Sequence, residues 1–178
     1  MATQIPPEFI RKIPKTDLHV HLDGSIRIDT LIELAREHRV PLPSYTEEGL
    51  KETVFKDRYA SLAEYLSGFQ YTTAVLQNGE SLERCAYELA CDNFTEGVRY
   101  LEVRFAPQLH IRPGFDTVDV LRYVNKGLQR AKNEINQFPT IVSGEEPPFE
   151  YGIIACAMRM FTPAFSDYYR RFTGIHPY

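Results

Sequence analysis

Two histidines set one residue apart could hold a metal ion. His19 and His21 fall in the segment from Asp17 to Leu22, where polar and apolar side chains alternate with the period of a β-strand. Side chains at positions i and i+2 of a strand point to the same side, so both imidazoles could reach one zinc ion at bond lengths of about 2.0–2.1 Å. We therefore predict that His19 and His21 bind zinc and that Asp17 orients one of the two rings.

The place of this pair along the strand supports the same prediction. The strand is expected to end at the turn of Asp23, Gly24 and Ser25, and the active sites of barrels and open α/β sheets gather at the carboxyl ends of parallel strands. The alternative interpretation is that the pattern only reflects a strand that alternates solvent-facing and core-facing residues.

Hydrophobic spacing places these residues in an alternation of strands and helices. The expected strands are residues 17–22, 98–105 and 152–160, and the expected helices are residues 28–39, 61–69, 81–97, 117–135 and 163–172. Residues 40–59 are expected to form a loop with room for one short helix, and residues 139–148 a second loop. Parallel neighbours need a crossover, which is usually a helix, so this order predicts an α/β fold.

Length and composition of residues 1–178 are those of one packed domain or of part of one. The chain is 43% hydrophobic and 25% charged, and 20 basic against 24 acidic side chains give a net charge of -4. Without a cationic excess, nucleic acid and anionic membranes are poor partners. The three cysteines form no CxxC pair, and no segment resembles a signal peptide or a membrane span, so we expect a cytoplasmic protein.

The run from Lys15 to Ile26 closely resembles the first metal-binding segment of the adenosine deaminase family. The resemblance continues in residues 40–43, 61–69, 96–107 and 156–159 and covers the chain to about residue 172. In this family, which is similar to the wider amidohydrolases, the fold is a TIM barrel with one zinc ion at its C-terminal mouth. The resemblance therefore implies the first three βα units of a TIM (β/α)8 barrel, incomplete at the C-terminus.

The resemblance also implies roles for individual residues. His19 and His21 would be two of the zinc ligands, and Asp23 would accept a hydrogen bond from the ribose 5′-hydroxyl of a nucleoside. Relatives that act on free adenine or on phosphorylated substrates differ in this segment, so Asp23 and Gly24 favour adenosine. The apolar residues Leu62, Tyr65, Leu66 and Phe69 match the gate helix over the purine pocket, although an aromatic stripe at helical spacing is also typical of plain core.

Two charged residues would point into such a barrel. Glu102 and Arg104 share one face of the second strand, and buried charges must be paired, so we expect an ion pair between them or with neighbouring residues. His38 and His110 match no metal position and are expected at the surface or at helix ends.

The activity that the resemblance implies is zinc-dependent hydrolytic deamination of adenosine or deoxyadenosine to inosine and ammonia. The family also uses a third histidine ligand with an adjacent glutamate, a further histidine and an aspartate, and no segment after Arg159 matches them. His176 is not expected to be a ligand. The chain alone is therefore expected to be the inactive N-terminal part of a deaminase.

Two other readings stay open. A non-catalytic binding or dimerising module would keep the front of the barrel and cover the open sheet edge at residues 152–160 by self-association. A related amidohydrolase would keep the chemistry and act on adenine or a modified nucleoside.

Overall fold

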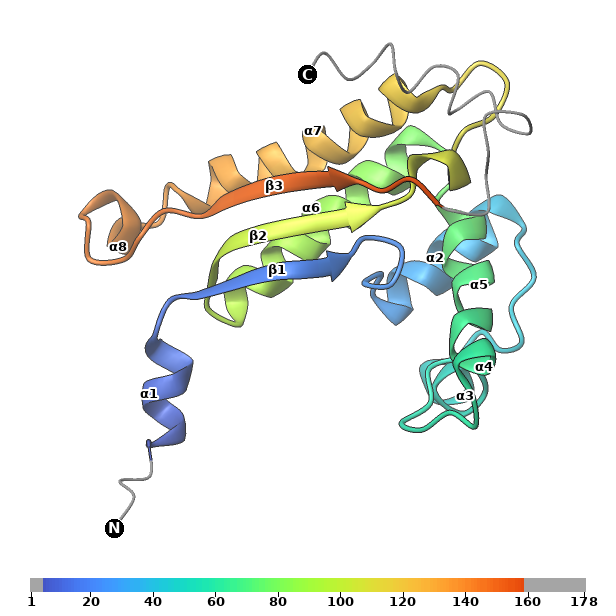
Figure 1. Ribbon diagram of the computed structural model, residues 1–178, viewed down its shortest axis with the longest axis horizontal. Helices are drawn as coiled ribbons and strands as arrows, with labels where there is room; N and C mark the ends of the chain where they lie inside the picture. Colours follow the sequence, from blue (N-terminus) through green and yellow to red (C-terminus); the bar gives the residue numbers. More distant parts are fainter. Residues whose placement is uncertain (1–4, 159–178) are drawn as a thin grey trace.

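Three parallel strands form the centre of the molecule. The computed structural model describes residues 5–158 and contains β1 (Lys15–His21), β2 (Val98–Phe105) and β3 (Glu150–Ala155), paired in the order β1-β2-β3 (Figure 1). The predicted α/β fold with a parallel sheet is confirmed. The helix predicted at residues 163–172 lies outside the described residues.

The helices are of very different lengths. They are α1 (Pro7–Lys12), α2 (Ile28–His38), α3 (Glu47–Thr53), α4 (Leu62–Ser67), α5 (Phe69–Val75), α6 (Gly79–Thr95), α7 (Thr117–Ile135) and α8 (Pro139–Val142), with a 3-10 turn, η1, at Pro107–Leu109. The three long helices, α2, α6 and α7, match their predicted ranges to within two residues at each end, and α3 is the short helix allowed for in residues 40–59. The structure adds α1 and α8, which the spacing of apolar residues did not predict. Within residues 5–158, no helix combines the length and the apolar character that crossing a bilayer requires.

Two predicted elements have different bounds. The third strand ends at Ala155, so its prediction was wrong for residues 156–158. Its only partner strand among residues 5–158 is β2, and β2 has already ended at Phe105, which pairs with Ala155. The helix predicted at residues 61–69 is α4, and helical structure continues beyond the predicted end, because α5 begins at Phe69 and runs to Val75. The predicted cap at its start is present, since Ser61 Oγ accepts a hydrogen bond from the Glu64 N–H.

Helices α6 and α7 cover one face of the sheet and form its core. Leu101, Val103 and Phe105, which alternate along β2, are at most 1% exposed and pack into this core. The two helices approach each other so closely that a Cβ at Gly127 would lie 2.2 Å from the Glu83 carbonyl oxygen. The period-two pattern of β2 is thus explained by one face buried under helices.

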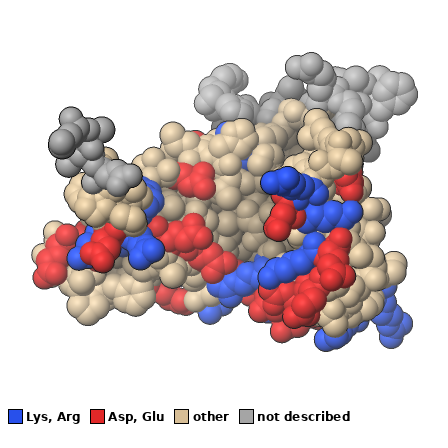
Figure 2. Space-filling model, turned by 90° about the horizontal axis from the view of Figure 1, so that it is seen from below, with Lys and Arg blue, Asp and Glu red and all other residues tan. Residues whose placement is uncertain are grey.

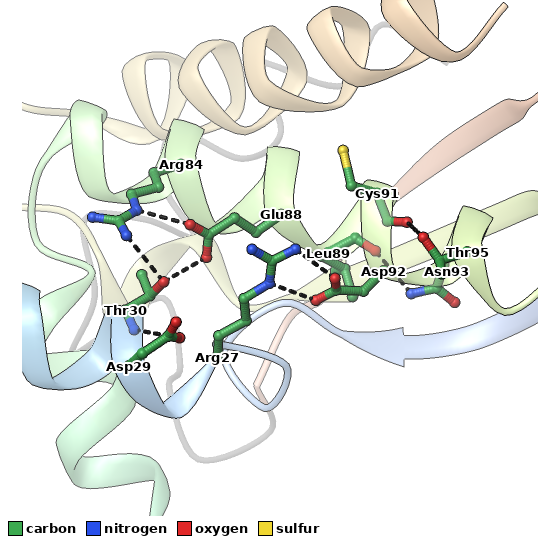
Figure 3. A network of polar contacts seen from close by, with 10 residues as sticks. All are labelled: Arg27, Asp29, Thr30, Arg84, Glu88, Leu89, Cys91, Asp92, Asn93 and Thr95. Atoms are coloured by element: carbon green, nitrogen blue, oxygen red, sulfur yellow. Dashed lines mark hydrogen bonds and ion pairs between the residues drawn. The ribbon is translucent and has the colours of Figure 1, made fainter. Parts of the chain in front are cut away.

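A polar network joins α2 to α6 at the edge of this core (Figure 3). Thr30 Oγ1 donates to Glu88 Oε2 at 2.7 Å, and Arg84 Nε donates to Glu88 Oε1 at 2.8 Å. Arg27 forms a two-pronged ion pair with Asp92 nearby. Similar pairing of opposite charges gives the face in Figure 2 its mixture of neighbouring acidic and basic side chains.

Strand β1 is irregular in the segment that holds the histidines. Its register with β2 shifts between Asp17 and Val20, whereas β3 pairs with β2 residue by residue without a shift. The Asp17 carboxylate accepts a hydrogen bond from the backbone N–H of His19 at 3.1 Å within this shift. A bulge of this kind changes the direction of the side chains that follow it.

Helices α3, α4 and α5 gather beyond the carboxyl ends of the strands, while α1 lies at the amino end of β1 (Figure 1). This arrangement leaves the loops after β1 and β2 facing α4 and α5, and it is there that the predicted site residues meet.

Candidate active site

His19 and His21 lie together at the carboxyl end of β1. Their ring centroids are 5.4 Å apart and their planes are inclined by 35°, as expected for two side chains on one side of a strand. Both residues are exposed, on the sheet face opposite α6 and α7. The prediction that the two rings share a side is therefore confirmed, while their role as ligands stays a prediction.

Arg104 approaches the same rings from β2. Its Nη1 lies 3.1 Å from His19 Nε2, and because a guanidinium can only donate, this nitrogen of His19 is an acceptor. Glu102 accepts a hydrogen bond from the Tyr100 hydroxyl. The expected ion pair of Glu102 and Arg104, with each other or with neighbouring residues, is therefore not formed among residues 5–158, where their partners are Tyr100 and His19.

Asp17 does not orient an imidazole. Its Oδ1 accepts a hydrogen bond from the backbone N–H of His19, so it shapes the strand rather than contacting either ring. The prediction was wrong on the atom that is contacted, since a short side chain two residues before His19 reaches the main chain most easily.

Asp23 sits in the turn after β1 and is 6% exposed. Its Oδ1 lies 3.8 Å from His21 Nδ1 and has no hydrogen-bond partner among the described residues. Burial raises the pKa of the Asp23 carboxyl above its ordinary value, and the nearby His110 and His21 oppose the shift. The position suits an acceptor that awaits a donor from a ligand.

A small hollow opens beside Asp23. Gly24, Tyr65 and Phe69 line it together with five residues that the sequence did not single out, Val54, Phe55, Tyr59, Gly68 and Thr72. Tyr65 packs edge-on against both Tyr59 and Phe69, with ring centroids 5.2 and 5.8 Å apart. Phe55 and Tyr59 could have been noticed as aromatic residues that follow the acidic stretch around Glu47.

The predicted gate residues divide into two groups. Tyr65 and Phe69 line the hollow with Asp23, whereas Leu62 and Leu66 lie outside it and are 71% and 51% exposed. Gly68, which separates α4 from α5, keeps helical backbone angles, and Tyr65 packs on Phe69 four residues later, so these two aromatic rings still lie side by side. All four remain predicted substrate contacts.

His110 is the main site residue that sequence reasoning missed. It ends the 3-10 turn η1 as predicted for a helix end, yet it is 0% exposed, so its expected surface position was wrong. His38 is exposed at the end of α2, as predicted. The apolar neighbours Leu109 and Ile111 were the only signal in the sequence that His110 is buried.

The donor chemistry at β1 fits two ligands of a zinc site. Imidazole nitrogen is an ordinary zinc ligand, and both rings share one side of the strand. Within residues 5–158, no group of three His, Cys, Asp or Glu side chains is arranged to hold a metal. The two imidazoles are thus fewer than the three protein ligands that a catalytic zinc site needs.

Solved structures identify the class of fold. An N6-methyl-AMP deaminase from Arabidopsis is 26% identical, with a TM-score of 0.67 over 87% of this chain and 44% of that one. A Burkholderia ambifaria amidohydrolase with bound zinc shares the fold at 20% identity, with a TM-score of 0.60 over 97% of this chain and 54% of that one. The sheet and its crossover helices are the first three βα units of a TIM-barrel amidohydrolase.

Sequence relatives identify the family. Residues 14–174 match the family model described as adenosine deaminase. A probable adenosine deaminase of Dictyostelium discoideum is 40% identical over 92% of this chain and 20% of the relative, and an adenosine deaminase of Clostridium botulinum is 42% identical over 68% of this chain and 37% of the relative. The chain belongs to the adenosine deaminase family and spans well under half the length of these relatives.

Proposed function

We propose that this chain supplies the front part of a zinc-dependent adenosine deaminase site, in which His19 and His21 are metal ligands and Asp23 binds the nucleoside. The observation that carries the proposal is the pair of rings on one side of β1, 5.4 Å apart, with the buried Asp23 carboxylate 3.8 Å from His21. The relatives named adenosine deaminase support the same substrate class.

Each residue has a distinct task in the reaction. His19 and His21 would hold zinc, which when bound acidifies water for hydrolysis. Asp23 would accept a hydrogen bond from the ribose 5′-hydroxyl and so fix the position of the purine. Tyr65 and Phe69 would exclude water from the purine face, with Leu62 and Leu66 completing the gate when α4 moves over the substrate.

We expect the isolated chain to be inactive. Residues 5–158 hold two histidines at the site, and a catalytic zinc site needs three protein ligands and an open position. Proton transfer to the purine also needs an acid, and the proposal assigns this role to no residue of the chain. Self-association through an open sheet edge and a cytoplasmic location remain predictions.

The test measures zinc binding and adenosine loss with the purified chain. We expect weak zinc binding that His19→Ala and His21→Ala each abolish, unchanged binding in His38→Ala as the matched control, and no loss of adenosine absorbance. Zinc binding that survives both site substitutions would overturn the metal assignment. Deamination at an ordinary enzymatic rate would overturn the expected inactivity.

A comparison of ligands tests the substrate. Adenosine is expected to shift NMR signals around Asp23 at lower concentration than adenine or AMP, since only the nucleoside offers a free 5′-hydroxyl to the carboxylate. Tighter binding of adenine or of a modified nucleoside would favour a related amidohydrolase. A soluble dimer that binds none of these ligands would favour the non-catalytic module.

A further inference from the structure

Helix α4 borders the hollow beside Asp23 without being anchored in the core. None of its six residues is buried, and its apolar side chains Leu62, Tyr65 and Leu66 are each at least 45% exposed. A helix of this length is only marginally stable by itself in water, so contacts outside the helix must hold it in place. Because Tyr65 lines the hollow, the contacts that hold α4 also set the shape of this wall.

The Glu64 carboxylate connects α4 to the residues that precede the helix. Its Oε1 accepts a hydrogen bond from Lys56 Nζ at 2.9 Å, and its Oε2 accepts one from the Ala60 N–H at 2.6 Å. The backbone N–H of Glu64 donates to Ser61 Oγ at the start of the helix. Both carboxylate oxygens are thus engaged, and the charged partner makes its contact stronger than a neutral hydrogen bond.

The segment before α4, residues 54–60, is itself fixed to the core. Val54 is buried in the core, and its carbonyl oxygen accepts a hydrogen bond from the Tyr59 hydroxyl at 2.9 Å. The Tyr59 ring in turn packs edge-on against Tyr65. Just beyond the end of α4, a Cβ at Gly68 would lie 3.3 Å from Val54 Cγ1, so the helix and the segment also meet closely there. Residues 54–60 are therefore a support against which α4 can be held.

We propose that Glu64 is a positioning residue, which holds α4 against residues 54–60 and so keeps Tyr65 at the wall of the hollow, where the purine base of a nucleoside would lie. The Lys56 and Glu64 side chains are each 35% exposed, and such pairs add little to the stability of a whole protein. Their contact can still decide how often a short surface helix opens, because local opening costs much less free energy than unfolding. This inference rests on the proposed binding of a nucleoside in the hollow, so its test has one arm that needs no ligand.

The first arm measures hydrogen–deuterium exchange at the backbone amides of α4 in the full chain without ligand. Glu64→Gln leaves one acceptor oxygen for two donors and should raise the exchange rate about threefold, as expected for a partly exposed ion pair. Lys56→Glu places two carboxylates against each other, so the rise should be about tenfold. Lys51→Glu makes the same change at the exposed pair with Glu47 on α3 and should leave the exchange of α4 unchanged.

Two outcomes of this arm overturn the proposal. One is an α4 exchange rate that stays unchanged in Glu64→Gln or in Lys56→Glu, and the other is an equal rise in Lys51→Glu. If Glu64→Gln does not fold, Lys56→Glu decides, because it leaves Glu64 and its contact with the Ala60 N–H in place.

The second arm tests whether the effect reaches the ligand through Tyr65. Lys56→Glu should raise the dissociation constant of adenosine about threefold, since only the fraction of chains with α4 in place presents this wall to the base. In the Tyr65→Leu background the effect should fall by at least half, which a general loss of structure would not produce. An unchanged affinity, or an effect that persists in that background, overturns the proposal. If the unsubstituted chain does not bind adenosine, the proposed function fails and the exchange arm alone decides whether Glu64 positions α4.

Discussion

The helix-covered face of the sheet and the carboxyl ends of its strands differ in the surroundings of their side chains. Under α6 and α7, Leu101, Val103 and Phe105 are enclosed by apolar neighbours. At the strand ends, His19 and His21 are exposed, and Asp23 and His110 bury polar atoms without partners among residues 5–158. The comparison teaches that the helix-covered face contributes stability, whereas burying unpartnered polar atoms at the strand ends costs free energy. Only a ligand, a metal ion or water at the strand ends offsets this cost.

The largest difference between the two regions should appear when leucines are truncated. Leu128→Ala, at a position on α7 that is 0% exposed, is expected to lower the free energy of unfolding by about 3 kcal/mol because it leaves a cavity. Leu62→Ala on α4, where the side chain is 71% exposed, should change it by less than about 0.5 kcal/mol. Urea denaturation measures both, and equal losses would contradict the division between the regions.

A smaller loss of stability is expected when a methyl group is added where α6 and α7 touch. Gly127→Ala would place a Cβ against the Glu83 carbonyl and should destabilise the protein by about 2 kcal/mol, since backbone cannot move aside easily. Thermal unfolding of this variant and of Gly24→Ala provides the contrast. A Cβ at Gly24 would meet the Phe69 ring at 3.3 Å and His21 Cβ at 3.4 Å, both side chains rather than backbone. A stability loss as large as that of Gly127→Ala would show that the strand-end region is packed as tightly as the core.

Breaking the polar network between α2 and α6 should destabilise the protein by about half as much as Gly127→Ala. Thr30→Val removes the hydroxyl that donates to the buried Glu88, at an expected cost of about 1 kcal/mol. Glu47→Gln, which breaks the exposed pair with Lys51, should change stability by no more than about 0.5 kcal/mol. If the two substitutions cost the same in urea, burial does not strengthen the Thr30 contact.

The smallest effect is a dependence of stability on pH at the strand ends. Burial lowers the pKa of His110 below its ordinary value of 6.5, against the opposing influence of the Leu76 carbonyl and of Asp23. As pH falls through 6.5 the unfolded chain takes up the proton before the folded one, so stability should fall on the acid side. His110→Gln should flatten this slope between pH 7.5 and pH 5.5, and His38→Gln should keep it.

The sequence predicted the regular part of the fold well because one face of each element is buried. The alternation in β2 and the three-four spacing in α7 are both consequences of the core between them. Helix α1 was missed because none of its residues is buried, so that no apolar period marks it. The helix at residues 61–69 was predicted to end at Phe69, whereas helical structure continues in α5 to Val75.

The site was predictable where neighbours in sequence determine it. His19, His21 and Asp23 come together because strand geometry and one turn place them. The contacts of His110 and Arg104 depend on Leu76 and His19, which are 34 and 85 positions away, and no local pattern encodes such distances. The expected pair of Glu102 and Arg104 failed for the same reason.

The irregular register of β1 has a consequence for how copies of this chain could meet. Among residues 5–158, the outer edges of β1 and β3 both lack a partner strand. A bulge disrupts the even row of backbone groups that an incoming strand needs, whereas β3 keeps six consecutive residues in register. We therefore expect an incoming strand to pair more readily with the β3 edge than with the β1 edge that carries the histidines.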